Sequence, residues 1–136
     1  MPKLVIVWLA LSGLLAANAQ TDARNKFVGA WEAKWKDKVI CTIRLRSGDP
    51  ISGETQACAF RADANGDLLE PETTEPSDGS PTPILNAKLN GEALTFEEQE
   101  DGDVIRFEMK LVGEGKAELR FLNTPVRINP IAFIRK

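Results

Sequence analysis

The chain has no histidine, no tyrosine and only two cysteines among its 136 residues. Without histidine it lacks the commonest general base, the commonest zinc ligand and the base of every Ser-His or Cys-His nucleophile pair. It also lacks an excess of basic residues, because 17 Lys and Arg stand against 20 Asp and Glu. That balance argues against nucleic acid as the main partner. The sequence therefore predicts a protein that is not an enzyme and that needs no metal and no cofactor.

Two acidic segments could suggest metal or acid–base chemistry, and neither has the required pattern. Residues 63–67 resemble the start of a calcium loop, but Leu68 stands where the loop needs glycine and Thr74 where it needs glutamate. We interpret them as a polar hairpin turn. Residues 97–103 hold several carboxylates, but we expect these on a turn without apolar surroundings. Glycoside cleavage by a carboxyl pair is therefore a poor fit.

The first nineteen residues have the features of an export signal. Lys3 provides a positive start, residues 4–16 are almost entirely apolar, and Ala17-Asn18-Ala19 is a small-x-small cleavage site. The apolar run is too short to span a bilayer, so no stable membrane anchor is expected. Cleavage would leave one domain at residues 20–136, secreted or periplasmic, where disulfides can persist.

After Phe27 nearly every segment alternates between apolar and polar residues, as strands with one covered face do. Turn residues separate these runs, and the strongest signal is Asn90-Gly91, which suits a two-residue type I′ hairpin. Residues 69–83 form one long acidic, proline-rich loop within the domain. We expect an all-β fold: an antiparallel up-and-down meander of eight or nine strands. Closure into a small barrel is favoured over a sandwich, because closure removes exposed strand edges.

The two cysteines, Cys41 and Cys58, are expected to be bonded to each other. They lie symmetrically about residues 48–51, so a four-residue loop would place them directly opposite on neighbouring antiparallel strands. With no CxxC motif and no histidine, a structural disulfide is favoured over a redox role. The same register places Glu54 and Gln56 on the inward face, either as polar groups at the barrel mouth or because Gly53 bulges the strand.

Residues 26–31 read Lys-Phe-Val-Gly-Ala-Trp, which resembles the K-F-x-G-x-W motif that opens the first strand of lipocalin barrels. In that family the tryptophan closes one barrel end, and an arginine of the last strand packs across it. The resemblance implies a barrel-closing role for Gly29 and Trp31, with either Arg127 or Arg135 as the arginine. The chain departs from the family in lacking the tyrosine of its second motif and in being shorter, which leaves less wall around a ligand chamber.

The chain also resembles the exported bacterial inhibitors of metalloproteases, which are small eight-stranded barrels with G-x-W near the mature N-terminus. Those proteins carry one disulfide between neighbouring early strands, similar to Cys41 and Cys58 here. In that family the free N-terminal segment enters the protease cleft, a role that would fall to residues 20–25. The long acidic loop and the sequence after Cys58 show no similarity to that family.

The residues of the predicted inward face are mostly large, so a filled core is favoured over an open ligand chamber. If a chamber exists, its candidate ligand-binding residues are Trp35, Glu54, Gln56, Phe107 and Met109. The sequence thus predicts a non-enzymatic, exported, lipocalin-like barrel that acts by binding a small apolar ligand. The alternative is an exported protein partner, such as a protease, bound through the loops and the N-terminal arm.

Overall fold

The computed structural model describes residues 23–56, 58, 60–70 and 80–136. The predicted export signal, residues 1–19, and the start of the N-terminal arm lie outside these residues. Among the described residues, no helix is long and apolar enough to cross a membrane.

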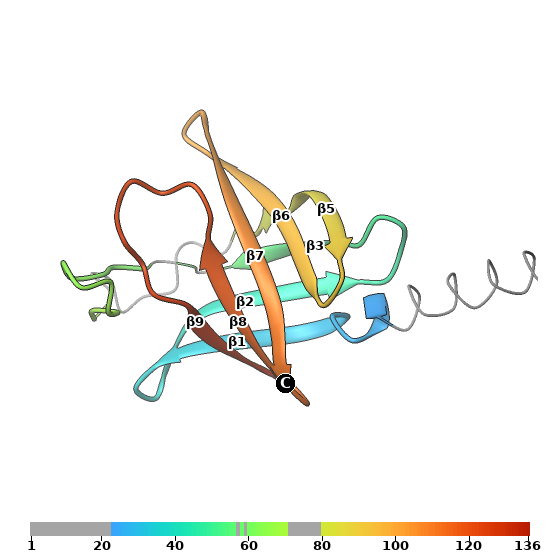
Figure 1. Ribbon diagram of the computed structural model, residues 1–136, viewed down its shortest axis with the longest axis horizontal. Helices are drawn as coiled ribbons and strands as arrows, with labels where there is room; N and C mark the ends of the chain where they lie inside the picture. Colours follow the sequence, from blue (N-terminus) through green and yellow to red (C-terminus); the bar gives the residue numbers. More distant parts are fainter. Residues whose placement is uncertain (1–22, 57, 59, 71–79) are drawn as a thin grey trace, which may run out of the picture.

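The described chain is an antiparallel meander of nine strands preceded by a short helical turn at residues 23–25 (Figure 1). The strands follow the period-two runs of the sequence, because each alternates between core-facing and solvent-facing side chains. They are β1 (Gly29–Trp35), β2 (Lys38–Arg46), β3 (Ser52–Gln56), β4 (Thr82–Pro83), β5 (Leu85–Asn90), β6 (Ala93–Glu100), β7 (Asp103–Gly113), β8 (Lys116–Phe121) and β9 (Ile131–Arg135).

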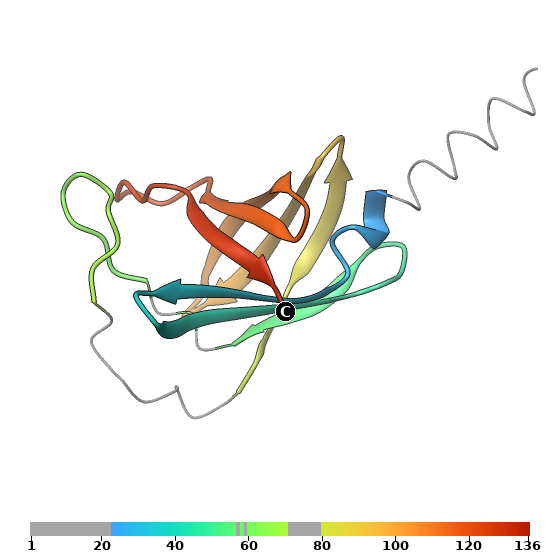
Figure 2. The ribbon, with the colours of Figure 1, turned by 90° about the horizontal axis from the view of Figure 1, so that it is seen from below.

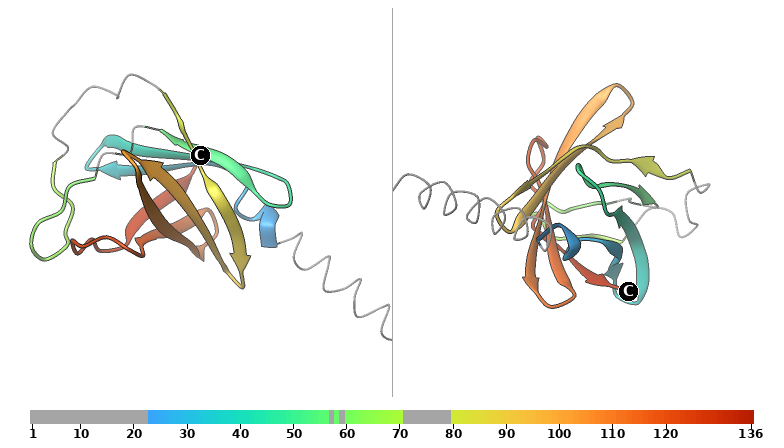
Figure 3. Two further views of the ribbon diagram at one scale, coloured as in Figure 1. Left: turned by 90° about the horizontal axis from the view of Figure 1, so that it is seen from above. Right: turned by 90° about the vertical axis from the view of Figure 1, so that its right-hand side faces the viewer.

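The sheet curls until its two ends meet, which confirms the predicted barrel. Its order is β4-β3-β2-β1-β9-β8-β7-β6-β5, with β1 paired to both β2 and β9. The end strands β4 and β5 are separated only by Ile84. They are therefore two halves of one bent strand, the first paired with β3 and the second with β6. The result is a nearly closed barrel, seen along different directions in Figure 3.

The predicted hairpin at Asn90-Gly91 forms, but its turn differs from the expected one. Asn90 pairs with Ala93, so the two loop residues are Gly91 and Glu92. Only Gly91 has a positive φ, 66°, as in a type II′ turn, which places glycine first. A turn with positive φ at both loop residues occurs instead between β6 and β7, at Asp101 (49°) and Gly102 (85°).

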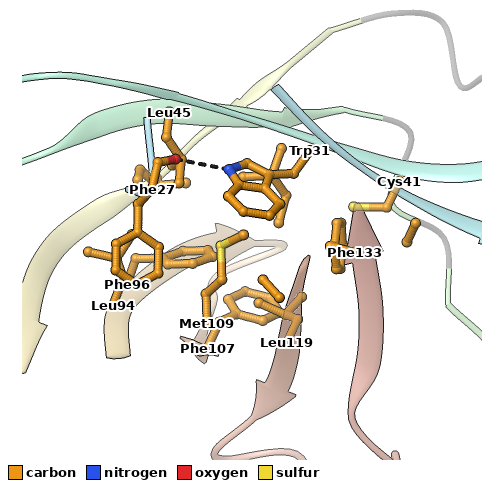
Figure 4. Close-up of a cluster of buried hydrophobic side chains, with 14 of the residues drawn as sticks. Phe27, Trp31, Cys41, Leu45, Leu94, Phe96, Phe107, Met109, Leu119 and Phe133 are labelled. Carbon is orange, nitrogen blue, oxygen red and sulfur yellow. Dashed lines mark hydrogen bonds between the residues drawn. The ribbon is translucent and has the colours of Figure 1, made fainter. Parts of the chain in front are cut away.

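Side chains fill the barrel with one cluster of buried apolar residues (Figure 4). Every strand of the barrel wall from β1 to β9 except β3 and β4 contributes a buried apolar side chain. The largest fully buried residues are Trp31, Phe27, Phe96, Phe133, Ile43, Leu94, Met109, Leu119 and Cys41. At one end of the cluster Phe107 stacks on Phe96 and meets Phe121 edge to face, with centroid separations of 5.3 and 4.9 Å.

The predicted disulfide is confirmed: Cys41 and Cys58 are bonded, with their Cα atoms 4.1 Å apart. The register predicted around it is wrong by one residue. β2 and β3 pair Arg46 with Ser52, so residues 47–51 form a five-residue loop instead of a four-residue one. Cys58 lies beyond the end of β3 and reaches Cys41 from outside the ladder.

This shift of one residue exchanges the two faces of β3, because successive side chains point to opposite sides. Gly53 and Thr55 are therefore buried, whereas Glu54 lies opposite the exposed Arg44 on the outer face. The ladder shows no bulge at Gly53. Glycine is required there for a different reason, since a Cβ would collide with the carbonyl oxygen of Arg44.

Reduction of the Cys41–Cys58 disulfide should lower the melting temperature by about 10 °C or more. The bond links residues 17 apart in sequence, and closing a loop of this length contributes roughly 3 kcal/mol. Each kcal/mol corresponds to about 3–5 °C in a domain of this size. Thermal unfolding with and without a reducing agent measures the change, and the Cys41→Ala/Cys58→Ala variant reproduces it without the reagent. Equal melting temperatures would contradict a structural role for the bond.

Candidate binding site at the barrel seam

Trp31 belongs to the buried cluster inside the barrel. It is fully buried, and its indole Nε1 donates a hydrogen bond of 2.9 Å to the carbonyl oxygen of Phe27 (Figure 4). The guanidinium of Arg135 lies over the ring at 4.6 Å from its centre and donates a hydrogen bond to the carbonyl oxygen of Lys26. Gly29, with φ of 130°, lies against this arginine, since a Cβ on Gly29 would be 3.8 Å from Arg135 Nε.

The structure thus places Arg135, and not Arg127, over Trp31. Arg127 lies at the other end of the barrel, where its Cγ is 3.0 Å from the position of a Cβ on Gly66. There the connection between β8 and β9 packs beside the turn at residues 63–67, and the Asn129 side chain donates to Asp67 at 2.8 Å (Figure 2). The turn itself is the predicted polar one, since Asp63 accepts from the backbone N–H groups of Asn65 and Asp67.

Trp31→Ala should lower the free energy of unfolding by about 3–5 kcal/mol, because it empties the space of a fully buried aromatic side chain. Arg135→Ala should cost about 1–2 kcal/mol, the range of a desolvated cation–π contact. Trp35→Ala should cost less than Trp31→Ala, since Trp35 is only partly buried. Urea denaturation measures all three, and Arg127→Ala is the matched control. A control as destabilising as Arg135→Ala would contradict the assignment.

The five residues predicted to bind a ligand do not form one site. Glu54 and Gln56 lie on the outer face, which corrects their predicted inward placement, and Glu54 bonds to Arg46 there at 2.5 and 3.1 Å. The hydrogen bond from Arg46 lowers the pKa of Glu54. Phe107 and Met109 are buried in the filled core, and Trp35 is half-buried beneath the ammonium of Lys36.

The barrel wall opens along a seam between β5 and the loop that joins β2 to β3. A hollow of about 640 Å³ lies there, and we name it the seam hollow. Its floor is apolar, because the buried side chains of Ile51, Ala87 and Leu94 form it. Its rim is charged and consists of Arg24, Asp49 and Lys88. Arg24 and Asp49 form an ion pair with each other at 3.6 Å.

The local sequence explains why the wall opens here. β4 has only two residues, and one of them, Pro83, has no N–H with which to continue a ladder. The last backbone hydrogen bond to β3 runs from Ile84 N to Gly53 O at 3.0 Å. Beyond it, Asn86 has a positive φ of 53°, and the β5–β6 register shifts nearby. β5 therefore bends away from β3, and the hollow lies where β5 faces the β2–β3 loop and the helical turn at residues 23–25.

A buried carboxyl group joins the two sides of the seam. Glu98 on β6 is only 4% exposed, and it accepts a hydrogen bond from the hydroxyl of Thr55 on β3. These two strands are not ladder neighbours, since β4 and β5 separate them in the sheet. Burial raises the pKa of Glu98, the hydrogen bond from Thr55 opposes this, and the Glu100 carboxylate adds to the rise.

The sequence pattern predicts that residues 97–103 form a turn, which would place Glu98 outside the strands. In the structure only residues 101 and 102 form the turn, because Glu100 pairs with Asp103. Glu98 therefore lies within β6. The alternation does contain the signal, since Leu94 and Phe96 share the inward face with Glu98. A charged residue within an apolar row is easily taken for the end of a strand.

No protein-family model matches the sequence, and no curated protein is similar to it at a significant level. The resemblances to lipocalins and to metalloprotease inhibitors therefore rest on the short motifs around Trp31 and the cysteines. The nearly closed antiparallel barrel is compatible with a lipocalin-like architecture.

The pH dependence of stability should carry the signature of Glu98. Its pKa in the folded protein is raised above the ordinary value of 4.5. Glu98 therefore contributes stability that is fully present below about pH 4.5 and is lost as pH rises through its folded pKa. Glu98→Gln should remove that loss and flatten the profile on the neutral side. Denaturant titrations at a series of pH values measure this.

Glu97→Gln is the matched control, on the outer face of the same strand. The hydrogen bond from Asn86, with a second from Arg106, lowers the pKa of Glu97. Its contribution is therefore present above about pH 4.5 and is lost as pH falls through the lowered pKa. Glu97→Gln should change the acid side of the profile. A wild type and a Glu98→Gln variant with parallel profiles would show that Glu98 is not a buried carboxyl.

Proposed function

We propose that this protein is a non-enzymatic, exported, lipocalin-like barrel that binds a small, mostly apolar molecule at the seam hollow. The proposal keeps the binding role expected from the sequence and moves the site. The lumen around Phe107 and Met109 is filled by side chains, whereas the seam hollow is open at the surface. The ligand would therefore bind beside the filled lumen, in the wall near one end of the barrel, and not inside the barrel.

The observation that carries this proposal is the combination of size and chemistry in the seam hollow. Its volume of about 640 Å³ falls in the range of about 300–1,000 Å³ typical of small-molecule sites. Such sites combine an apolar lining with a few polar groups that orient the ligand. Ile51, Ala87 and Leu94 supply the apolar surface here, and Lys88 together with the Arg24–Asp49 ion pair supplies the polar groups.

Export is supported by two independent features of the chain. Residues 1–19 have the pattern of a signal peptide. The Cys41–Cys58 disulfide is typical of proteins in oxidising compartments. Together they favour a secreted or periplasmic location, where a small binding barrel would meet ligands from outside the cell.

A second candidate function is inhibition of an exported protease through the N-terminal arm. It is favoured because several contacts attach the base of the arm to the barrel. Phe27 is fully buried, and its carbonyl oxygen accepts from the indole of Trp31. The neighbouring carbonyl oxygen of Lys26 accepts from Arg135. Of the expected inhibitory segment, residues 20–25, the part from Ala23 onward forms the helical turn on the barrel, and the rest lies outside the described residues.

Binding of the neutral fluorescent probe N-phenyl-1-naphthylamine tests the first function. The wild type should bind it, and Ala87→Phe should weaken binding at least about tenfold, because the new ring fills the seam hollow. Ala132→Phe is the matched control, since Ala132 is exposed on β9. Equal affinities in the two variants would overturn the seam site. A wild type that binds no apolar probe would leave the inhibitor function as the better account.

A further inference from the structure

Two inward-facing rows of residues form the sides of the seam. One runs from Ile51 along β3 to Thr55, and the other runs along β6 from Leu94 to Glu98. The seam hollow lies between Ile51 and Leu94 at one end. The hydrogen bond from Thr55 to Glu98 lies at the other end. The two sides therefore share a hollow at one end and a single buried polar contact at the other.

The surroundings of Glu98 contain no partner for a negative charge among the described residues. Its opposite neighbour on β7 is Ile105, and the nearest contributing charge is the like-charged Glu100. On β3 the charged residue Glu54 points outward and is paired with Arg46.

Two further strands pack here. β4 consists of Thr82 and Pro83 and carries no charge. The one charged residue of β5, Lys88, is exposed and lies opposite Thr95, away from the inward face that Glu98 shares. On β7, Arg106 bonds to Glu97 on the outer face at 3.1 Å. Within the part of the chain that the structure describes, an ionised Glu98 would thus keep the hydrogen bond from Thr55 and would have no neighbouring cation. Burial of such a charge is costly unless water reaches it.

We propose that Glu98 is a proton-controlled latch that opens the seam and thereby widens the seam hollow. With its carboxyl protonated, Glu98 stays buried against Thr55 and holds β6 to β3. When the proton leaves to solvent, the carboxylate draws water into the seam, and the sides separate at the point where only two residues of β4 bridge them. The regulation of ligand binding rests on the proposed function, whereas the opening itself does not.

Amide hydrogen exchange at a series of pH values, corrected for the intrinsic rate, tests the opening without any ligand. The amides of Thr55, Ile84 and their neighbours should lose protection as pH rises through the pKa of Glu98, by up to about tenfold per pH unit, the limit for one proton. Amides of β8, on the far wall, should keep their protection and serve as an internal control. Uniform loss on both walls would overturn the latch.

Three variants separate a latch from a merely structural contact. Glu98→Gln cannot ionise and should abolish the pH-dependent loss of protection. Thr55→Val removes the hydrogen bond that lowers the pKa of Glu98, so the transition should move to higher pH. Glu118→Gln, on the partly exposed face of β8, should leave the transition unchanged. A Thr55→Val variant that loses protection equally at all pH values, without moving the transition, would contradict the proposal.

Probe binding at the same pH values then tests the regulation. If the latch controls the seam hollow, the affinity of the wild type for N-phenyl-1-naphthylamine should change across the transition, while that of Glu98→Gln stays constant. Affinity that is independent of pH in both proteins would overturn the regulatory part. Absence of probe binding at every pH, together with normal pH-dependent exchange, would instead contradict the proposed function and leave the latch standing.

Discussion

The indole of Trp31 connects more parts of the described chain than a strand pairing alone would. It lies in β1, the strand that joins the two halves of the sheet through β2 and β9. The guanidinium of Arg135, on the last strand, packs over its ring. Its N–H donates a hydrogen bond to the carbonyl oxygen of Phe27, which precedes the first strand. One side chain thus connects the start and the end of the folded chain. Because the ring is fully buried, these contacts form away from competing water, which strengthens them.

The wall at the seam is held by far fewer backbone contacts between strands. Where β4 meets β3, only two residue pairs and the Ile84–Gly53 hydrogen bond close the sheet. Proline in β4 and the positive φ of Asn86 limit what the backbone can contribute there. The buried carboxyl of Glu98 lies within this wall, which is why we propose that the barrel opens here. The contacts around Trp31 and the sparse pairing at the seam are the reasons for which we propose the seam as the binding site.

The fold was largely predictable from the sequence, because the patterns that indicate it are local. Alternation identified the strands, glycine-containing turns separated them, and the cysteine spacing identified the disulfide. The face of β3 was not predictable, since it depends on a loop of five residues instead of four. That difference of one residue placed Thr55 inside and Glu54 outside.

The choice of Arg135 over Arg127 likewise depended on which arginine lies opposite Trp31 in the β1–β9 ladder, and spacing cannot reveal this. Glu98 followed the alternation, but a carboxyl is not expected in a core row unless its partner is known.

Methyl NMR shows directly whether a ligand binds at the proposed site, the seam hollow beside the filled lumen. Spectra of the protein with methyl-labelled Ala, Ile, Leu and Met would be recorded as N-phenyl-1-naphthylamine is added. We expect the methyl signals of Ala87, Ile51 and Leu94 to shift, while those of Met109 and Leu119 in the lumen keep their positions. Shifts centred on Met109 and Leu119, with the seam methyls unchanged, would contradict the proposed site.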